Sequence, residues 1–487
     1  MQGTEGIQNV QDEVVLKEGF AELDTFLINP ISAKMIPAFV PHGLLYLASY
    51  ALREGYKVQI QDRNVDESDW GKVIREKKPK VIGIGCLTGT VVDDAVYLSK
   101  EIKKIDPNIK IVWGGIHVTL APDSVLKKNY VDYVVIGDGE VAYTKILDYV
   151  VRSEGSLDAI DNLGFKVGQD HKYNTRSFVD LDTIPLPAWH LVDVPKYIKK
   201  KFYASRTLCI NTSRGCPYGC SFCSVPATSL RNWSSMSAKK VVEHLEFLVK
   251  NYGINGFQVD DDEFDIDRSR VLEFCDQLKE KKLKLKWSHF SRINIVKEDV
   301  VNREIDAGLS MIEFGIESGS PRMLKLLNKG QTVEKIRKAY EICGRLDVKT
   351  SALFMVGLPT EKIEDVDATV KLIRSLTNHQ TICTIYRPYP GTELFDYVVK
   401  NGLFEYDDEL ENIGKRYERL INTSGIDTSY LLKIQSSFDR RNIFQEIIAI
   451  VCKFNYGLFF YYATQVLFSD RFKRKVAFKG AEKYYGT

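Results

Sequence analysis

The sequence of 487 residues has little of several features that mark whole classes of protein. Its formal net charge is only +2, so its overall charge does not predict nucleic-acid binding. Nine cysteines scattered over this length do not make a disulfide framework, and we therefore expect a reducing, cytoplasmic environment. The first twenty residues have no apolar core, so no secretory signal is predicted there.

The composition is that of an ordinary globular protein. Hydrophobic residues make up 44% and charged residues 27% of the chain, which provides enough apolar side chains for sizeable cores. The length favours two or three domains. In a reducing compartment, a tight cysteine cluster within such a protein is expected to bind metal or take part in chemistry.

Short β-branched runs alternate with amphipathic helical patterns from residue 20 to 152, which we assign to a first domain. This alternation predicts a doubly wound parallel sheet, whose ligands bind beyond the carboxyl ends of the strands. Glycines at strand ends let a backbone approach a bulky ligand closely, although any single one could equally be an ordinary turn residue. The candidate ligand-binding residues are Thr88, Gly89, Gly114, Gly115, His117, Gly137, Gly139 and Glu140.

The alternation stops over residues 153–205, where Pro185 and Pro187 favour an extended linker. A second strand–helix series follows over 206–400. Its six units lack the full eight of a closed barrel and predict an open, partial (β/α)6 barrel. Residues 405–487 have a helical pattern and form the last predicted region.

Three cysteines lie within RGCPYGCSFCS, residues 214–224, directly after the first predicted strand of the second series. Cysteines with the spacing of Cys216, Cys220 and Cys223 can bind an iron–sulfur cluster. The alternative is a structural zinc site, but such sites are usually closed by four protein ligands. The nearby Cys209 lies inside a predicted strand and is not an obvious fourth ligand. A cluster with only three cysteine ligands has one iron open.

The spacing C-x-x-x-C-x-aromatic-C, completed here by Phe222, resembles the signature of the radical S-adenosylmethionine (SAM) superfamily. The resemblance implies that the open iron of a 4Fe–4S cluster binds the amino and carboxylate groups of SAM. It also implies that electron transfer from the cluster yields a 5′-deoxyadenosyl radical, which abstracts hydrogen from carbon. An external electron donor of the flavodoxin or ferredoxin type is expected.

Further segments resemble the SAM-binding strand ends of that superfamily, in the family's order. VDDDEF is similar to the acidic motif near the SAM amino group, EFGIESGS to the ribose-contacting strand, and FMVGLPTE to the strand beside adenine. RPYPGTEL, residues 387–394, resembles the segment that closes the domain. The SAM-binding residues that the resemblance implies are Asp261, Asp262, Arg292, Glu317, Ser318, Val356 and Gly357.

The amino-terminal segments PHGLLYLASYALREGYKVQIQD, GGIHVTLAPD and VVIGDGE resemble the cobalamin-binding domain of one subgroup of these enzymes. That subgroup includes methyltransferases and the anaerobic magnesium-protoporphyrin monomethyl ester cyclase. The D-x-H-x-x-G motif that places a histidine on cobalt is absent, and the domain's histidines, His42 and His117, lie in other contexts. The resemblance therefore implies a cobalt without a histidine ligand. The alternative is a domain that kept the fold and lost the cofactor.

The other cysteines exclude some relatives. Methylthiotransferases of the superfamily carry three more cysteines in their amino-terminal domain, where this chain has only Cys86. Members with auxiliary clusters need cysteine-rich tails, and only Cys452 lies beyond residue 400. We therefore expect one cluster per chain.

Residues 443–468 form an unusually apolar and aromatic stretch, followed by RFKRK. Glu446 and Lys453 interrupt it, which argues against a membrane span of about twenty apolar residues. A helix over the barrel mouth is the favoured interpretation. The alternatives are a pocket for a greasy substrate and a peripheral contact with a membrane surface.

The leading hypothesis is an enzyme that methylates an unactivated carbon of a small or lipid-like substrate with cobalamin, SAM and one 4Fe–4S cluster. A radical cyclase or rearrangement enzyme of the anaerobic porphyrin cyclase type is the competing hypothesis. A non-catalytic metal-binding protein is the third, but such a protein has no need of SAM-binding strand ends.

Overall fold

The computed structural model describes residues 21–32, 39–377 and 379–439. The apolar stretch 443–468 lies outside these residues. None of the helices in the described ranges combines the length and apolar content that crossing a membrane requires.

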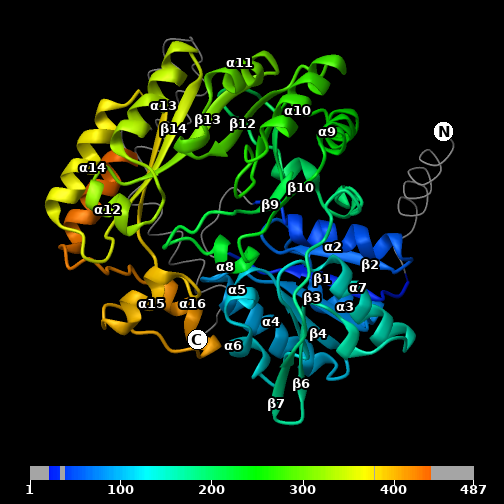
Figure 1. Cartoon of the computed structure of the whole chain (residues 1–487). Helices are drawn as coiled ribbons and strands as arrows, with labels where there is room; N and C mark the ends of the chain where they lie inside the picture. The colour runs from blue at the N-terminus through cyan, green and yellow to red at the C-terminus, as the bar shows by residue number, and fades with distance from the viewer. Residues whose placement is uncertain (1–20, 33–38, 378, 440–487) are drawn as a thin grey trace. The chain divides into compact units, whose positions relative to one another are not determined.

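The amino-terminal part is built on a seven-stranded sheet in the order β2-β1-β3-β4-β5-β6-β7 (Figure 1). Its strands are β1 (Thr25–Asn29), β2 (Val58–Asp62), β3 (Val81–Gly85), β4 (Lys110–Gly114), β5 (Tyr133–Val135), β6 (Leu163–Val167) and β7 (Asp170–Tyr173). The first five strands are parallel, whereas β6 and β7 join antiparallel and extend the sheet into the segment 153–205. The parallel strands are almost wholly buried, as expected when helices cover both faces of a sheet.

Helices connect the parallel strands. They are α2 (His42–Arg53), α3 (Trp70–Lys77), α4 (Val91–Ile105), α5 (Ile116–Leu120), α6 (Pro122–Leu126) and α7 (Glu140–Leu147). In α2 the buried residues Leu44, Leu45, Ala48 and Ala51 recur at three- and four-residue spacing, so one face of the helix packs on the sheet. The helix ends before Gly55, whose φ of 87° lies in a region that favours glycine.

The linker after β7 is tied to both neighbouring parts by buried side chains. Short helical turns lie at Trp189–Leu191 and Val194–Tyr197. The Trp189 indole N–H donates to Nε2 of His244 at 2.8 Å, and the Tyr197 hydroxyl donates to Asp62 at 2.7 Å. These contacts give the linker a defined path, because buried polar groups need such partners.

The second sheet has six strands in the order β15-β14-β13-β12-β11-β8. They are β8 (Thr207–Ile210), β11 (Gly256–Val259), β12 (Lys286–Ser291), β13 (Leu309–Glu317), β14 (Lys349–Val356) and β15 (Gln380–Ile385). Neighbouring strands such as β8 and β11, or β14 and β15, run parallel. The predicted partial (β/α)6 barrel is therefore confirmed, together with the doubly wound sheet before it.

Helices between and after these strands complete the fold. They are α8 (Val225–Ser229), α9 (Ala238–Tyr252), α10 (Arg268–Glu280), α11 (Glu298–Asp306), α12 (Pro321–Leu326), α13 (Val333–Arg345), α14 (Ile363–Ser375), α15 (Glu393–Lys400) and α16 (Leu410–Glu418). Several begin at residues whose side chains accept a backbone N–H, as Ser237 does for α9 and Asp267 for α10. A short hairpin of β9 (Ser213–Gly215) and β10 (Trp233–Ser235) brackets the cysteine loop.

The chain divides into two compact units. Of the described residues, the first unit contains those up to 290, together with 302–310 and 388–421. The second contains those within 291–301, 311–387 and 422–439. The cysteine loop and the amino-terminal sheet belong to the first unit. Arg292, Glu317, Ser318, Val356 and Gly357 belong to the second.

Candidate cofactor sites

A cavity of about 680 Å³ lies at the carboxyl ends of the parallel strands of the first sheet. Part of its wall is backbone, because Gly85, Gly114, Gly115, Gly137 and Gly139 line it. Gly115 has a φ of 100°, and a Cβ there would come within 2.7 Å of the Cys86 carbonyl oxygen. A concave, glycine-lined wall at the ligand end of such a sheet fits a large, flat ring such as a corrin.

The structure brings five of the residues predicted to bind cobalamin together in this wall. Gly114, Gly115, Gly137, Gly139 and Glu140 all line the cavity. Glu140 is buried, and its carboxylate is held in an ion pair with Arg214. The direct contact of these residues with cobalamin stays a prediction.

The other three predicted residues, Thr88, Gly89 and His117, are not among those that line the cavity. His117 is fully buried beside Thr88, with 3.3 Å between Nδ1 and the Thr88 hydroxyl oxygen. Burial lowers the pKa of His117 to about 4, so the imidazole is neutral at physiological pH. It lies in α5, where its backbone N–H donates to the Cys86 carbonyl oxygen.

Sequence reasoning missed part of the lining. Asn29 ends β1, Asn64 follows β2, and Tyr46 and Leu47 come from α2. The two asparagines could have been found, because they lie at strand ends on the ligand side of the sheet. The α2 residues could not, because a helical pattern shows which residues are buried and not which of them border a cavity.

The same cavity is lined by residues that lead into the cysteine loop. Asn211, Ser213, Arg214, Asp260 and Asp262 come from the barrel segments of the first unit. The guanidinium of Arg214, in β9, donates to both carboxylate oxygens of Glu140, at 2.5 and 3.2 Å, and to Asp138 at 3.2 Å. Burial opposes ionisation of both partners. Their mutual attraction outweighs it, so the pKa of Glu140 is lowered and that of Arg214 raised.

The three cysteines of the loop lie close together. Cys216 and Cys220 are buried and Cys223 is half-buried. Burial raises the pKa of the Cys223 thiol to about 12, and the nearby Cys220, Asp262 and Cys216 add to the shift. Gly215, with φ of 81°, is needed for the entry turn, because a Cβ there would lie 2.1 Å from the Asn232 carbonyl oxygen.

This arrangement fits a cluster of several irons. Among the residues that the structure describes, no three His, Cys, Asp or Glu side chains converge on the position of one metal ion. The cysteines of a cubane bind different irons, so their thiolates do not need to converge. Cys216, Cys220 and Cys223 are thus the residues that would hold a 4Fe–4S cluster.

The acidic strand end after β11 braces the approach to this loop. Asp261 accepts hydrogen bonds from the N–H and hydroxyl of Thr212, each at 2.6 Å, and from the Ser213 hydroxyl at 2.7 Å. Asp262 accepts the N–H of Gly215 at 2.9 Å. Asp261 is buried and occupied by these bonds, whereas Asp262 is exposed and also lines the cavity.

In the second unit, the structure links Arg292 and Glu317 through Lys329. The Arg292 guanidinium donates to the Lys329 carbonyl oxygen, and the Lys329 ammonium lies 2.5 Å from a carboxylate oxygen of Glu317. Glu317 has a φ of 64° at an irregularity in the pairing of β13 with β14. Non-glycine residues rarely adopt this conformation, and such strain clusters at functional sites.

The remaining predicted SAM residues of this unit are buried. The hydroxyl of Ser318 lies 3.0 Å from that of Thr369. After Val356, the N–H of Gly357 donates to the Glu361 carboxylate at 2.6 Å, which orders the turn that follows β14. Desolvation raises the pKa of Glu361 to about 7, against the effect of this bond. The roles of these residues toward SAM stay predictions.

Comparison with known proteins identifies both parts of the chain. Residues 31–147 match the family model of the B12 binding domain, and residues 210–373 match that of the radical SAM superfamily. An uncharacterized methyltransferase of Pyrococcus horikoshii is 32% identical over 74% of this chain and 79% of its own length. The anaerobic magnesium-protoporphyrin IX monomethyl ester cyclase of Rubrivivax gelatinosus is 28% identical over 73% of this chain and 65% of its own length.

Solved structures share the fold. The radical SAM methyltransferase TsrM of Kitasatospora setae superimposes with a TM-score of 0.67 at 19% identity, over 77% of this chain and 76% of its own. The cobalamin-dependent SAM radical enzyme OxsB gives 0.63 at 20% identity, over 83% and 57%. The chain therefore belongs to the radical SAM enzymes that carry a B12-binding domain. The predicted family, the enzymatic nature and the three cofactors (4Fe–4S cluster, SAM and cobalamin) are confirmed.

Proposed function

We propose that this enzyme transfers a methyl group to an unactivated carbon of a small or lipid-like substrate. When bound, the cluster and SAM supply a 5′-deoxyadenosyl radical, and cobalamin carries the methyl group. The observation that carries the proposal is the shared wall of the cavity. Residues of the B12-binding domain line it together with Arg214 and Asp262, which flank the entry to the cysteine loop.

In this proposal, different parts of the chain bind the different cofactors. Residues 20–152 hold cobalamin, 206–400 hold the cluster and SAM, and the linker 153–205 joins them. The thiolates of Cys216, Cys220 and Cys223 bind the cluster, and Asp262 faces the amino group of SAM. Arg292, Glu317, Ser318, Val356 and Gly357 contact the remainder of SAM, and Asp261 positions the strand end by its bonds to Thr212 and Ser213.

We also propose that no histidine binds the cobalt. His42 is the histidine among the described lining residues, and both of its ring nitrogens are buried. Burial, with the nearby Arg214, lowers its pKa to about 3, so the ring is neutral, and neither nitrogen has a hydrogen-bond partner among the described residues. A neutral imidazole can bind a metal, so the proposal rests on the missing D-x-H-x-x-G motif, and His42 is the residue that the test must exclude. Electron paramagnetic resonance of the cob(II)alamin form tests this directly, because nitrogen superhyperfine splitting from a protein histidine would contradict it.

The competing candidate is a radical cyclase, and one finding favours it specifically. The porphyrin cyclase of Rubrivivax gelatinosus matches 73% of this chain, so the same domain order serves a reaction without methyl transfer. Methyl transfer remains the proposal. The reason is that the Pyrococcus horikoshii relative, named as a methyltransferase, is 32% identical to this chain, against 28% for the cyclase.

Product analysis separates the two reactions. Methylation by this route uses one SAM as methyl donor and a second as radical source. We therefore expect S-adenosylhomocysteine and 5′-deoxyadenosine in equal amounts from reduced enzyme with cobalamin, SAM and substrate. 5′-Deoxyadenosine without matching S-adenosylhomocysteine, with the true substrate present, would contradict the methyltransferase proposal. A variant with Cys216, Cys220 and Cys223 replaced by alanine is the control, and it should contain no cluster iron and form neither product.

Two partner proposals complete the function. Radical formation needs a reductant, and we propose an external flavodoxin- or ferredoxin-type donor.

The second partner proposal is a peripheral membrane contact through the stretch 443–468, because its apolar and aromatic residues are followed by the basic RFKRK. Sedimentation with anionic phospholipid vesicles tests it: the full chain should sediment with the vesicles, and a chain ending at residue 439 should stay in the supernatant. Equal sedimentation of the two chains would contradict the proposal.

A further inference from the structure

The geometry points to Arg214 as a positioning residue that couples the filling of the cavity to the cysteine loop. This inference rests on the proposed function, in that the cavity is taken to bind cobalamin. It goes further by naming the contact through which the bound corrin and the cluster loop influence each other. The role assigned to Arg214 is to act through the loop, and no catalytic step is assigned to it.

The backbone around Arg214 has little freedom to move independently of the loop. Ser213, before it, is held by Asp261, and Gly215, after it, donates its N–H to Asp262. Gly215 also cannot retreat toward Asn232, whose carbonyl oxygen is already close. Cys216 follows directly, so a displacement of the Arg214 side chain acts on a short, braced segment that ends at a cluster ligand.

The side chain of Arg214 extends from this segment into the cavity wall. Its planar guanidinium binds Glu140 through two nitrogens and Asp138 through one, and lies 5.3 Å from the centre of the Tyr46 ring. Each of these four residues lines the cavity. A fork of hydrogen bonds of this kind fixes direction as well as distance.

The same turn of the B12-binding domain, residues 137–140, also holds the other end of the cysteine loop. Arg176 lies against Gly137, where a Cβ would come within 2.4 Å of its guanidinium. Arg176 donates to the carbonyl oxygen of Thr228 at 2.6 Å, in helix α8, which begins two residues after Cys223. A ligand that displaces the turn 137–140 would therefore shift the segments on both sides of the three cysteines.

An ordinary buried ion pair that only stabilises the fold is the alternative. The two roles differ in what they predict for binding. A coupling between two sites is reciprocal, so loading the cluster must change cobalamin affinity by the same factor as cobalamin changes the cluster's. A purely stabilising pair leaves these two equilibria independent.

The experiment measures the dissociation constant of hydroxocobalamin for the full chain with its cluster and after removal of the cluster by chelation. For the wild type we expect the two constants to differ by about 5-fold or more. In Arg214→Gln and Glu140→Gln the ratio should fall to within about twofold of one. Arg214→Lys should give an intermediate ratio, because lysine keeps a charge but not the fork.

A matched control is Lys103→Gln. Lys103 forms a partly buried ion pair with Asp132 at 2.7 Å, and neither residue lines the cavity. This variant should keep the wild-type ratio. A second readout is the electron paramagnetic resonance spectrum of the reduced cluster with and without cobalamin, whose difference should vanish in Arg214→Gln.

An unchanged ratio in Arg214→Lys and Arg214→Gln, or a wild-type ratio of one, would overturn the inference. If Arg214→Gln does not fold, the ratio measured for Arg214→Lys decides whether the inference holds. None of these measurements uses methyl transfer. If the ratio of dissociation constants differs from one but no S-adenosylhomocysteine forms, the proposed function is wrong and the inference stands. If methylation occurs and the ratio is one, the inference is wrong and the proposed function stands.

Discussion

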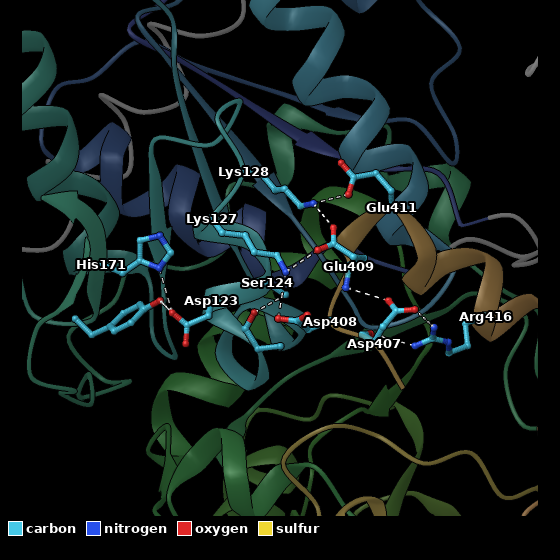
Figure 2. A network of polar contacts seen from close by, with 12 residues as sticks. Asp123, Ser124, Lys127, Lys128, His171, Asp407, Asp408, Glu409, Glu411 and Arg416 are labelled. Carbon is cyan, nitrogen blue, oxygen red and sulfur yellow. Dashed lines mark hydrogen bonds and ion pairs between the residues drawn. The ribbon is translucent and has the colours of Figure 1, made fainter. Parts of the chain in front are cut away.

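Two groups of ion pairs join the B12-binding domain to later parts of the first unit, and they differ in burial. The cavity junction consists of Asp138, Glu140 and Arg214. The rim network ties α6 and its neighbours to the start of α16, and Figure 2 shows its members Lys127, Lys128, Asp408, Glu409 and Glu411. Lys100 and Tyr130 also belong to it, because both bind Glu411. At the junction the Glu140 side chain is 3% exposed, whereas at the rim Glu409 is 53% exposed.

The rim network is made of many alternative contacts. Lys128 lies 2.8 Å from Glu409 and 2.6 Å from Glu411, and Lys127 lies 3.1 Å from both Asp408 and Glu409. Beneath it, α16 packs on α4 with Leu410, Ile413 and Tyr417 buried. The apolar contact provides most of the docking energy, because exposed ion pairs contribute little.

The difference shows how ion pairs can serve two purposes in one unit. A buried pair contributes little net stability but is costly to break, because one charge is then left without its partner. It therefore fixes geometry, as the position of Arg214 beside the cysteine loop requires. The exposed network can lose one contact and keep the others, so it holds a helix in place without fixing it closely.

The largest expected effect comes from breaking the cavity junction. Glu140→Ala leaves the Arg214 guanidinium with Asp138 alone in a mostly buried site. Because 27% of the Arg214 side chain is exposed, we expect the lower end of the range for buried pairs, about 3 kcal/mol of unfolding free energy. Urea unfolding followed by circular dichroism measures it. A decrease in unfolding free energy of less than about 1 kcal/mol would mean that the cavity junction contributes no more than the exposed ion pairs of the rim network.

A smaller effect is expected at the rim. A double-mutant cycle of Lys128→Ala and Glu411→Ala should give a coupling energy of about 0.5 kcal/mol, and at most about 1 kcal/mol. The reason is that Glu411 is 36% exposed and Lys100 and Tyr130 also bind it. The same unfolding measurement applies. A coupling energy similar to the Glu140→Ala loss would remove the distinction between the two regions.

Much of the fold could be predicted because it depends on local patterns. Strand–helix alternation identified both sheets, and three cysteines with a fixed spacing identified the cluster loop. The glycines of the cavity wall could be predicted for the same reason. They follow strands that are buried on both sides, and Gly114, Gly115, Gly137 and Gly139 line the cavity as expected.

The two junctions could not be predicted, because they depend on pairing across long stretches of chain. Arg214 and Glu140 are 74 residues apart, and Lys128 and Glu411 are 283 apart. Many charged residues along the chain could serve as their partners. Thr88 and His117 show the reverse problem: they come soon after the ends of β3 and β4 as expected, but His117 is buried in α5 against Thr88 and neither residue lines the cavity.

Salt sharpens the comparison, with a smaller effect again. Raising ionic strength from 0.1 to 1 M shortens the Debye length from about 10 to about 3 Å and screens exposed charges far more than buried ones. The coupling energy of Lys128 and Glu411 should therefore fall toward zero in 1 M salt, whereas the Glu140→Ala loss should change little. Equal reductions at both places would contradict the assignment of the junction as buried.

The smallest effect is the response of one rim carboxylate to acid. Because the Glu411 side chain is 36% exposed, solvent screens most of its interaction with the lysines, and we expect the change in stability to stay well below 1 kcal/mol. Burial alone would raise the pKa of Glu411, but hydrogen bonds from Lys128, Tyr130 and Lys100 outweigh it and lower the pKa to about 2. A carboxylate with a lowered folded-state pKa stabilises the fold above its unfolded pKa, and this contribution is lost as pH falls toward the folded value. The stability difference between wild type and Glu411→Gln should therefore be constant from pH 7 down to about 4.5 and shrink between about 4.5 and about 2. The pKa values of Lys128 and Tyr130 are raised, so both stay protonated in this range, and the change reports on the rim carboxylates that Lys128 binds, Glu411 and Glu409. Unfolding of the two proteins at matched pH values measures it, and a difference that shrinks already between pH 7 and pH 5 would show that the lysines do not hold Glu411 as the structure indicates.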